Sequence, residues 1–290
     1  MVALLQYMLL YCLIKPSIEH HYSQILGIQL QLQFSSLNFM LLVLSCVFIT
    51  AAGYVINDYF DLSIDSINNP EKVIVGKSIS LRTALALHWV LNIVGVLLGF
   101  YVSWSLDMLN LGFIFVFSAG LLWFYSTIFS KELLVGNIIV AMLTAILPLI
   151  VAVFEIIPLN YTYVNELRMY YLNFNAILFW ILGFSFFAFI TNFTREIIKD
   201  VEDLEGDCTY GRNTVPIALG VKNAKRIIVS LLLILSISIS WAMLLFIKDF
   251  VSRLYLFVVV VLPSLITIFV VVKANDAKKY AIASKLLTII

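Results

Sequence analysis

The sequence predicts an all-α, polytopic membrane protein, and three observations carry this prediction. Hydrophobic residues make up 62% of the 290 residues, whereas charged residues make up only 12%. The mean hydropathy is +1.04, so the chain has more apolar surface than a soluble domain can bury. The apolar residues also fall into runs of about 20 residues, the length that crosses a bilayer as a helix. We therefore expect the chain to lie in a lipid bilayer.

The apolar runs place the expected membrane-spanning helices. Those at the two ends of the chain are too short to cross a bilayer, so the first and last helices are expected to be incomplete in this chain. The whole chain, 1–290, is expected to form one transmembrane domain. The expected helices cover 1–14, 37–56, 81–104, 108–129, 133–154, 173–192, 224–247, 253–272 and 280–290.

The distribution of basic residues predicts the orientation. Fourteen of the 18 Lys and Arg residues lie in the segments that follow the second, fourth, sixth and eighth spans. Basic residues are enriched on the cytoplasmic side of membrane proteins, so these segments are expected to be cytoplasmic.

Charge and cysteine content exclude several other classes of protein. The net charge is +1, and no basic stripe is interleaved with aromatic residues, so a nucleic-acid partner is not expected. The three cysteines, Cys12, Cys46 and Cys208, include no CxxC pair. They support neither a disulfide framework nor a zinc site.

Two acidic motifs follow apolar runs on the predicted cytoplasmic side. The first is NDYFDLSID at 57–65, and the second is REIIKDVEDLEGD at 195–207. Residues four apart share a helix face, so each motif should present a stripe of oxygen ligands. The candidate metal ligands are Asn57, Asp58, Asp61, Asp65, Asp200, Asp203 and Asp207.

Two acidic stripes that face each other would repel unless a cation lay between them. Hard oxygen ligands favour Mg²⁺, which keeps waters and bridges to substrate phosphates. The motifs therefore predict one Mg²⁺ site for a diphosphate. Basic side chains nearby are candidates to bind the phosphate oxygens or the acceptor: Lys72, Lys77, Lys131, Arg195, Lys199 and Arg212.

The paired motifs, NDxxDxxxD and DxxxD, resemble those of the UbiA superfamily of intramembrane prenyltransferases. The resemblance extends to the turn at 68–70, Gly76, Ser80, Tyr125, Ser126, Lys131, Gly136 and Asn137. It implies a ring of about nine helices around a central cavity, capped by loops at about 57–80 and 193–223. Under this cap, Mg²⁺ would hold an allylic polyprenyl diphosphate, geranylgeranyl or similar, with its tail in the apolar cavity.

The resemblance also implies an activity and a location. The protein would transfer the prenyl group to a lipophilic acceptor in the cell inner membrane, with its active site on the cytoplasmic side. Candidate catalytic residues are Asp61, Asp203, Lys131 and Tyr125, the last through cation–π stabilisation of the allylic cation. Asn137 and Asn192 lie near span ends on the same side and are expected to orient ligands.

Three functions stay open at this point. The amino-acid sequence of the second motif is most similar to that of superfamily members that act on geranylgeranylglyceryl phosphate. It also resembles the chlorophyll-synthase branch, and an aromatic or quinone precursor of the 4-hydroxybenzoate or naphthoate type is the alternative acceptor. A divalent-cation transporter is the alternative of another class, but it predicts acids near the bilayer midplane rather than at span ends.

Overall fold

The computed structural model describes residues 2–68 and 70–288. Within these residues the regular structure is helical, and an isolated bridge between Val75 and Ile79 is the only β-type pairing. Eight helical runs are long and apolar enough to span a membrane, which confirms the predicted class. They are Val2–Leu26, α3 (Ser36–Asn68), α4 (Leu81–Ser105), η4 with α5 (Leu109–Thr127), α6 (Val135–Thr162), α8 (Asn175–Glu202), α11 (Val221–Phe246) and Phe250–Lys273.

Short helices connect these spans or follow them. They are η3 (Pro70–Lys72), η5 (Phe129–Lys131), α7 (Val164–Met169), α9 (Leu204–Thr209), α10 (Val215–Leu219) and α14 (Ala277–Leu287). The predicted cap segments at 57–80 and 193–223 are therefore largely helical rather than loops. Asn69, in the predicted turn at 68–70, lies outside the described residues, as does the side chain of Lys72.

The first helix is longer than predicted. It runs through α1 (Val2–Met8), η1 (Leu9–Ile14), η2 (Ser17–Tyr22) and α2 (Ser23–Leu26), so the expectation that it ends at Ile14 is wrong. Polar residues after Ile14 hid its continuation, because they alternate with a stripe of buried residues spaced four apart: Ile14, Ile18, Tyr22 and Leu26. The π-type turns lie on either side of Pro16, which has no backbone N–H to donate.

The described helices form two compact units. Unit 1 comprises 1–62, 74–126 and 145–186, and unit 2 comprises 63–73, 127–144 and 187–290. The single domain over 1–290 and the ring around a central cavity stay predictions.

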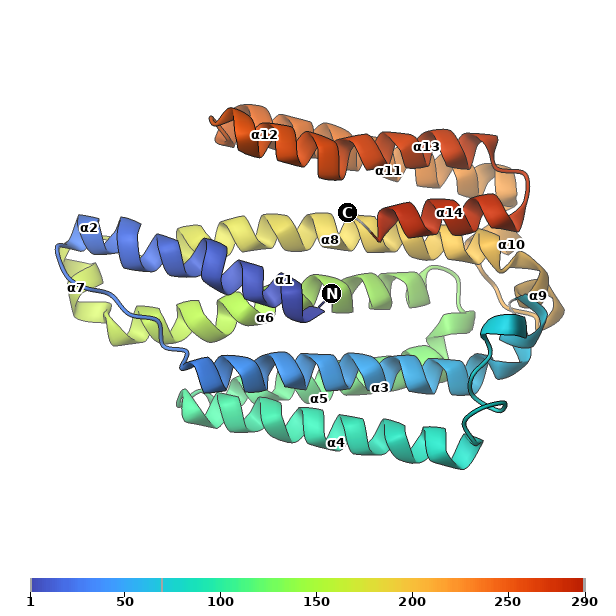
Figure 1. Cartoon of the computed structure of the whole chain (residues 1–290), viewed down its shortest axis with the longest axis horizontal. Helices are drawn as coiled ribbons and strands as arrows, with labels where there is room; N and C mark the ends of the chain where they lie inside the picture. Colours follow the sequence, from blue (N-terminus) through green and yellow to red (C-terminus); the bar gives the residue numbers. More distant parts are fainter. Residues whose placement is uncertain (1, 69, 289–290) are drawn as a thin grey trace. The chain divides into compact units, whose positions relative to one another are not determined.

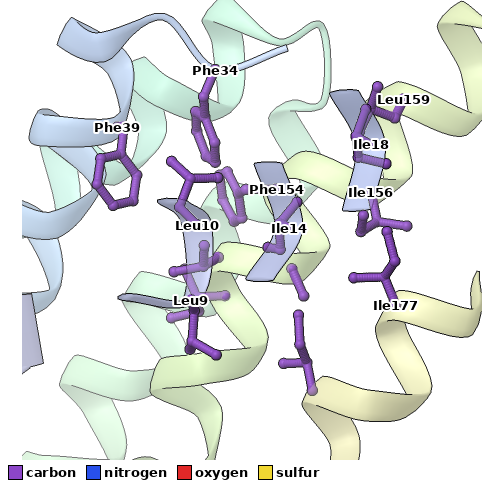
Figure 2. Packing of buried hydrophobic residues seen from close by; sticks show 14 of the residues in the cluster. Leu9, Leu10, Ile14, Ile18, Phe34, Phe39, Phe154, Ile156, Leu159 and Ile177 are labelled. Atoms are coloured by element: carbon purple, nitrogen blue, oxygen red, sulfur yellow. The ribbon is translucent and has the colours of Figure 1, made fainter. Parts of the chain in front are cut away.

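The core of unit 1 forms where the first helix packs on α6. Figure 2 shows Leu10 and Ile14 of the first helix beside Phe154 and Ile156 of α6, and all four side chains are buried. Lipid tails are as apolar as these side chains, so close packing rather than removal from water stabilises such contacts within a membrane. The packing fixes the first helix against α6.

A buried carboxylate, Glu155 of α6, holds the segment between the first helix and α3. Its two oxygens accept the backbone N–H groups of Gln33 at 2.6 Å and Phe34 at 3.0 Å. Both donors lie in an irregular segment where no helix supplies acceptors. Glu155 therefore takes the place of missing secondary structure.

We expect Glu155→Leu to lower the free energy of unfolding by about 2–6 kcal/mol, because two donors lose their acceptor at about 1–3 kcal/mol each. Glu155→Gln keeps one carbonyl oxygen and should cost roughly half as much. Unfolding in mixed detergent micelles would measure both. Equal stability of Glu155→Leu and the natural protein would contradict this account.

The core of unit 2 fixes the orientation of the helix that carries most of the second acidic motif. In this unit α13 (Leu262–Lys273) packs against both α11 and α14, as Figure 1 shows at the red end of the chain. The core includes Ile197, Ile198 and Val201 of α8 together with Ile228 of α11. Burial of these α8 residues fixes the rotation of the helix, so Arg195, Lys199 and Asp200 stay outside the fully buried core.

Candidate functional site

The first motif lies on α3, which continues as one helix through Asn68. In unit 1, the Asn57 amide donates to Asp61 Oδ2 at 3.0 Å, so these two residues share a face as predicted. Asp61 is buried, and Asp58 is exposed. The side-chain oxygen Oδ1 of Asn57 is buried and accepts no hydrogen bond from the described residues. Such an oxygen could act as a ligand of a bound cation.

The second motif is not one continuous helix, which corrects the prediction. α8 ends at Glu202, and α9 begins after Asp203, whose φ of −94° and ψ of 12° interrupt the helix. Backbone bonds still cross the break, from Asp203 N–H to Lys199 O at 2.8 Å and from Asp207 N–H to Asp203 O at 3.1 Å. The predicted spacing therefore survives.

The second motif gathers its carboxylates in unit 2 with the last turns of α3. The Asp203 carboxyl interacts electrostatically with Glu202, Asp207 and Asp65. Burial and these three charges raise the pKa of Asp203 to about 7, against the opposing effect of Lys199. Asn137 donates to Asp200 Oδ2 at 2.9 Å, and its predicted role in orienting ligands stays a prediction.

The other predicted ligand-orienting amide makes a different contact. Asn192 donates to the Thr144 hydroxyl at 2.9 Å, which joins α8 to α6 within unit 2.

The donor set fits Mg²⁺ shared with a phosphate group. Among the described residues, no three His, Cys, Asp or Glu side chains close into a metal cage on their own. Mg²⁺ does not require one, because it keeps several waters and typically binds one or two carboxylates together with substrate phosphates. Within unit 2, the mutually repelling carboxylates around Asp203 are hard oxygen ligands that a cation would stabilise. Within unit 1, the buried side-chain oxygen of Asn57 is a ligand of the same kind.

Acidic side chains orient three of the predicted phosphate-binding cations. Glu196 is buried, and its Oε1 lies 3.1 Å from both Arg195 Nη1 and Lys199 Nζ. Arg212 Nη1 lies 3.5 Å from Asp207 Oδ1, and both side chains are largely buried. Glu196 was not among the predicted site residues, since one acid between two basic residues is common on helix surfaces.

The remaining predicted residues divide between the units. Lys131 is exposed in unit 2, and its backbone oxygen accepts the N–H of Asn213 at 3.0 Å. Lys77 lies in an exposed turn of unit 1, and Tyr125 is half-buried in α5 of the same unit. Unit 2 thus contains Asp65, Lys131, Arg195, Lys199, Asp200, Asp203, Asp207 and Arg212, and unit 1 contains Asn57, Asp58, Asp61, Lys77 and Tyr125.

Glycine is required where α6 begins. A Cβ at Gly136 would lie 2.7 Å from the Phe129 backbone oxygen, so only glycine permits this close approach. The contact packs η5, which carries Lys131, against the turn that presents Asn137.

Eight candidate membrane spans define an integral membrane protein, and in unit 2 carboxylates lie together where α3 and α8 end. The chain belongs to the UbiA prenyltransferase family, whose sequence model matches residues 25–289.

Curated relatives share about a third of their residues with this chain. The digeranylgeranylglyceryl phosphate synthase of Methanobrevibacter smithii is 35% identical over 197 residues, which cover 67% of this chain and 63% of the relative. That of Methanosphaera stadtmanae is 35% identical over 217 residues, which cover 74% of this chain and 70% of the relative. The match to the first of these relatives thus spans less than two thirds of its length.

Solved structures share the fold. A structure of digeranylgeranylglyceryl phosphate synthase in membranes aligns with a TM-score of 0.57 and 24% identity, covering 100% of this chain and 94% of the other. A UbiA homologue from Archaeoglobus fulgidus bound to DMAPP and Mg²⁺ aligns with a TM-score of 0.53 and 15% identity, covering 98% and 96%.

The raised pKa of Asp203 predicts a pH-dependent stability. Because the pKa of Asp203 is about 7 in the folded state and about 4 in the unfolded state, stability falls as the pH rises between these two values, and the loss is complete above pH 7. In EDTA, Asp203→Asn should therefore raise the Tm at pH 8 and raise it less at pH 5.

The matched control is Asp249→Asn. The pKa of the exposed Asp249 is lowered by its hydrogen bonds to Ser252, so this variant should gain no stability at pH 8. Thermal unfolding in detergent would compare the two variants. A lower Tm for Asp203→Asn at pH 8 would show that Asp203 is not under electrostatic strain.

Proposed function

We propose that this protein transfers a prenyl group from an allylic polyprenyl diphosphate to a lipophilic acceptor within the membrane, with Mg²⁺ as cofactor. The observation that carries this proposal is a cluster of four carboxylates in unit 2: Asp65, Asp200, Asp203 and Asp207. Membership of the UbiA prenyltransferase family supports it. So does the A. fulgidus homologue, which binds an allylic diphosphate with Mg²⁺.

The chain's residues would have three roles. Asn57, Asp61, Asp65, Asp203 and Asp207 would hold Mg²⁺, with Asp58 and Asp200 supporting them. When bound, Mg²⁺ neutralises the charge that develops on the diphosphate as its carbon–oxygen bond breaks. Lys72, Lys77, Lys131, Arg195, Lys199 and Arg212 would bind phosphate oxygens.

Two features of the chain favour productive binding. Glu196 keeps Arg195 and Lys199 in fixed positions, so less side-chain entropy is lost when the diphosphate binds. The ring of Tyr125 would face the allylic cation and stabilise its delocalised charge.

We propose geranylgeranylglyceryl phosphate, or a closely similar lipid, as the acceptor. Such an acceptor carries its own phosphate in addition to the diphosphate, and this second anion needs further cations. The flanks of the two motifs supply five basic residues, more than a diphosphate already bound to Mg²⁺ requires: Lys72, Lys77, Arg195, Lys199 and Arg212. Two curated relatives are named as digeranylgeranylglyceryl phosphate synthases, which favours this acceptor over an aromatic one.

We also propose that both motifs face the cytoplasm from the cell inner membrane. The excess of Lys and Arg on that side supports this orientation.

Asp61→Asn and Asp203→Asn should each reduce prenyl transfer by at least about 10²-fold, because each replaces a charged metal ligand by a neutral one. Transfer from geranylgeranyl diphosphate would be followed with purified protein, and Asp249→Asn is the matched control. Near-normal turnover of Asp61→Asn or Asp203→Asn, or full activity in excess EDTA, would refute the proposal.

The orientation predicts which cysteines react with an impermeant thiol reagent. Cys208 is native and exposed, and Tyr171 is 97% exposed at the opposite end of α8. In cells that carry Cys12→Ser, the reagent should label Cys208 only after the membrane is permeabilised. With Cys208 also replaced by Ser, Tyr171→Cys should be labelled from outside. Labelling of both positions from the same face would be incompatible with the proposed orientation.

A further inference from the structure

Asn68, the last residue of α3, contacts the second acidic motif within unit 2. Its Nδ2 donates to the backbone oxygen of Asp203 at 3.2 Å, and its Oδ1 accepts the backbone N–H of Gly206 at 2.9 Å. Both ends of the amide are used, so the side chain has one orientation. These bonds join the first motif's helix to the corner between α8 and α9.

The contact with Gly206 leaves no room for a side chain at that position. A Cβ built on Gly206 would lie 2.6 to 2.8 Å from the amide atoms of Asn68. The φ of Gly206 is not positive, so glycine is needed here for space and not for an unusual backbone conformation.

Asn68 also accepts the Gly206 N–H, a bond that the N-cap residue of a helix normally makes. Asp203 is the N-cap residue of α9, and Gly206 is the third residue of that helix. An N-cap aspartate usually accepts this N–H with its own carboxylate. Here the Asp203 side chain makes no capping bond, and Asn68 accepts the N–H instead. The carboxylate of Asp203 is thereby left for another partner.

We infer that Asn68 is a positioning residue for the metal site: by capping α9 from another helix, it prevents Asp203 from turning back to cap its own helix. The inference rests on the proposed function, in which Asp203 and Asp207 bind Mg²⁺. Without Asn68, the Gly206 N–H loses its acceptor, and the carboxylate of Asp203, the N-cap residue of the same helix, would accept it and leave the metal site. Residues that orient metal ligands in this way commonly contribute to affinity without touching the ion.

The test is Mn²⁺ binding to the full-length protein in detergent, measured by electron paramagnetic resonance with inorganic pyrophosphate present. Asn68→Ala should weaken Mn²⁺ binding by about 10- to 100-fold. Asn68→Asp keeps the acceptor for the Gly206 N–H but loses the donor to the Asp203 backbone oxygen, so its affinity should lie between those of Asn68→Ala and the natural protein. Asn223→Ala is the control, because the Asn223 amide, like that of Asn68, both donates and accepts a hydrogen bond, but with Leu219 O and Arg226 Nη1, which belong to neither motif.

A double-mutant cycle tests the contact itself. Gly206→Ala alone should weaken Mn²⁺ binding, because the new methyl group displaces Asn68. Adding Asn68→Ala removes that clash, so the double variant should bind Mn²⁺ no more weakly than Asn68→Ala alone. If the double variant instead loses Mn²⁺ affinity by the product of the two single-variant factors, the two residues act independently, and the inference is overturned.

Two further outcomes separate this inference from the proposed function. If Asn68→Ala binds Mn²⁺ as tightly as the natural protein, the positioning role is wrong while the proposed function stands. If the natural protein neither binds Mn²⁺ with pyrophosphate nor transfers a prenyl group, the proposed function fails, and this inference fails with it. Thermal unfolding of each variant measures its stability separately. Weaker Mn²⁺ binding by a variant that remains folded is expected for Asn68→Ala, whereas Asn223→Ala should keep the affinity of the natural protein.

Discussion

The burial of carboxylates that also repel one another is the physical constraint on which the proposed site depends. Asp203 shares its surroundings with Asp65, Glu202 and Asp207, and burial raises the cost of ionising it. A chain that keeps such a group must recover the cost from a bound cation or lose stability near neutral pH. The surrounding residues are consistent with the first outcome. Asn68 caps α9 in place of Asp203, and Asn137 holds Asp200 with a hydrogen bond.

The cations of unit 2 show the complementary arrangement. Glu196 holds Arg195 and Lys199 on α8, and Asp207 lies beside Arg212. Each acid partly neutralises its cations before any phosphate arrives, yet it also fixes their positions. Fixed cations lose less entropy than flexible ones when they bind an anion, and in the proposed function their charge would stabilise the diphosphate. The site therefore depends on alternating charge rather than on a single patch of either sign.

Features governed by apolar run length and helical periodicity could be predicted from the sequence. Seven of the eight spans and the grouping of acids four residues apart follow from those patterns, with span ends displaced by several residues. The first helix was misjudged because its buried stripe at Ile14, Ile18 and Tyr22 is interleaved with Lys15, Glu19 and two histidines. Glu155, Glu196 and Asn68 were missed because their partners are backbone groups or close neighbours, and no spacing rule reports such contacts.

Transfer of a prenyl group to a phosphate-bearing lipid is the central claim, and the mass of the product tests it most directly. Purified protein would be incubated with geranylgeranyl diphosphate, Mg²⁺ and a panel containing geranylgeranylglyceryl phosphate, 4-hydroxybenzoate and a naphthoate. One new product is expected, whose mass equals that of geranylgeranylglyceryl phosphate plus one geranylgeranyl group less a hydrogen. Prenylation of an aromatic acceptor alone would contradict the acceptor assignment, and the absence of any prenylated product would contradict the account as a whole.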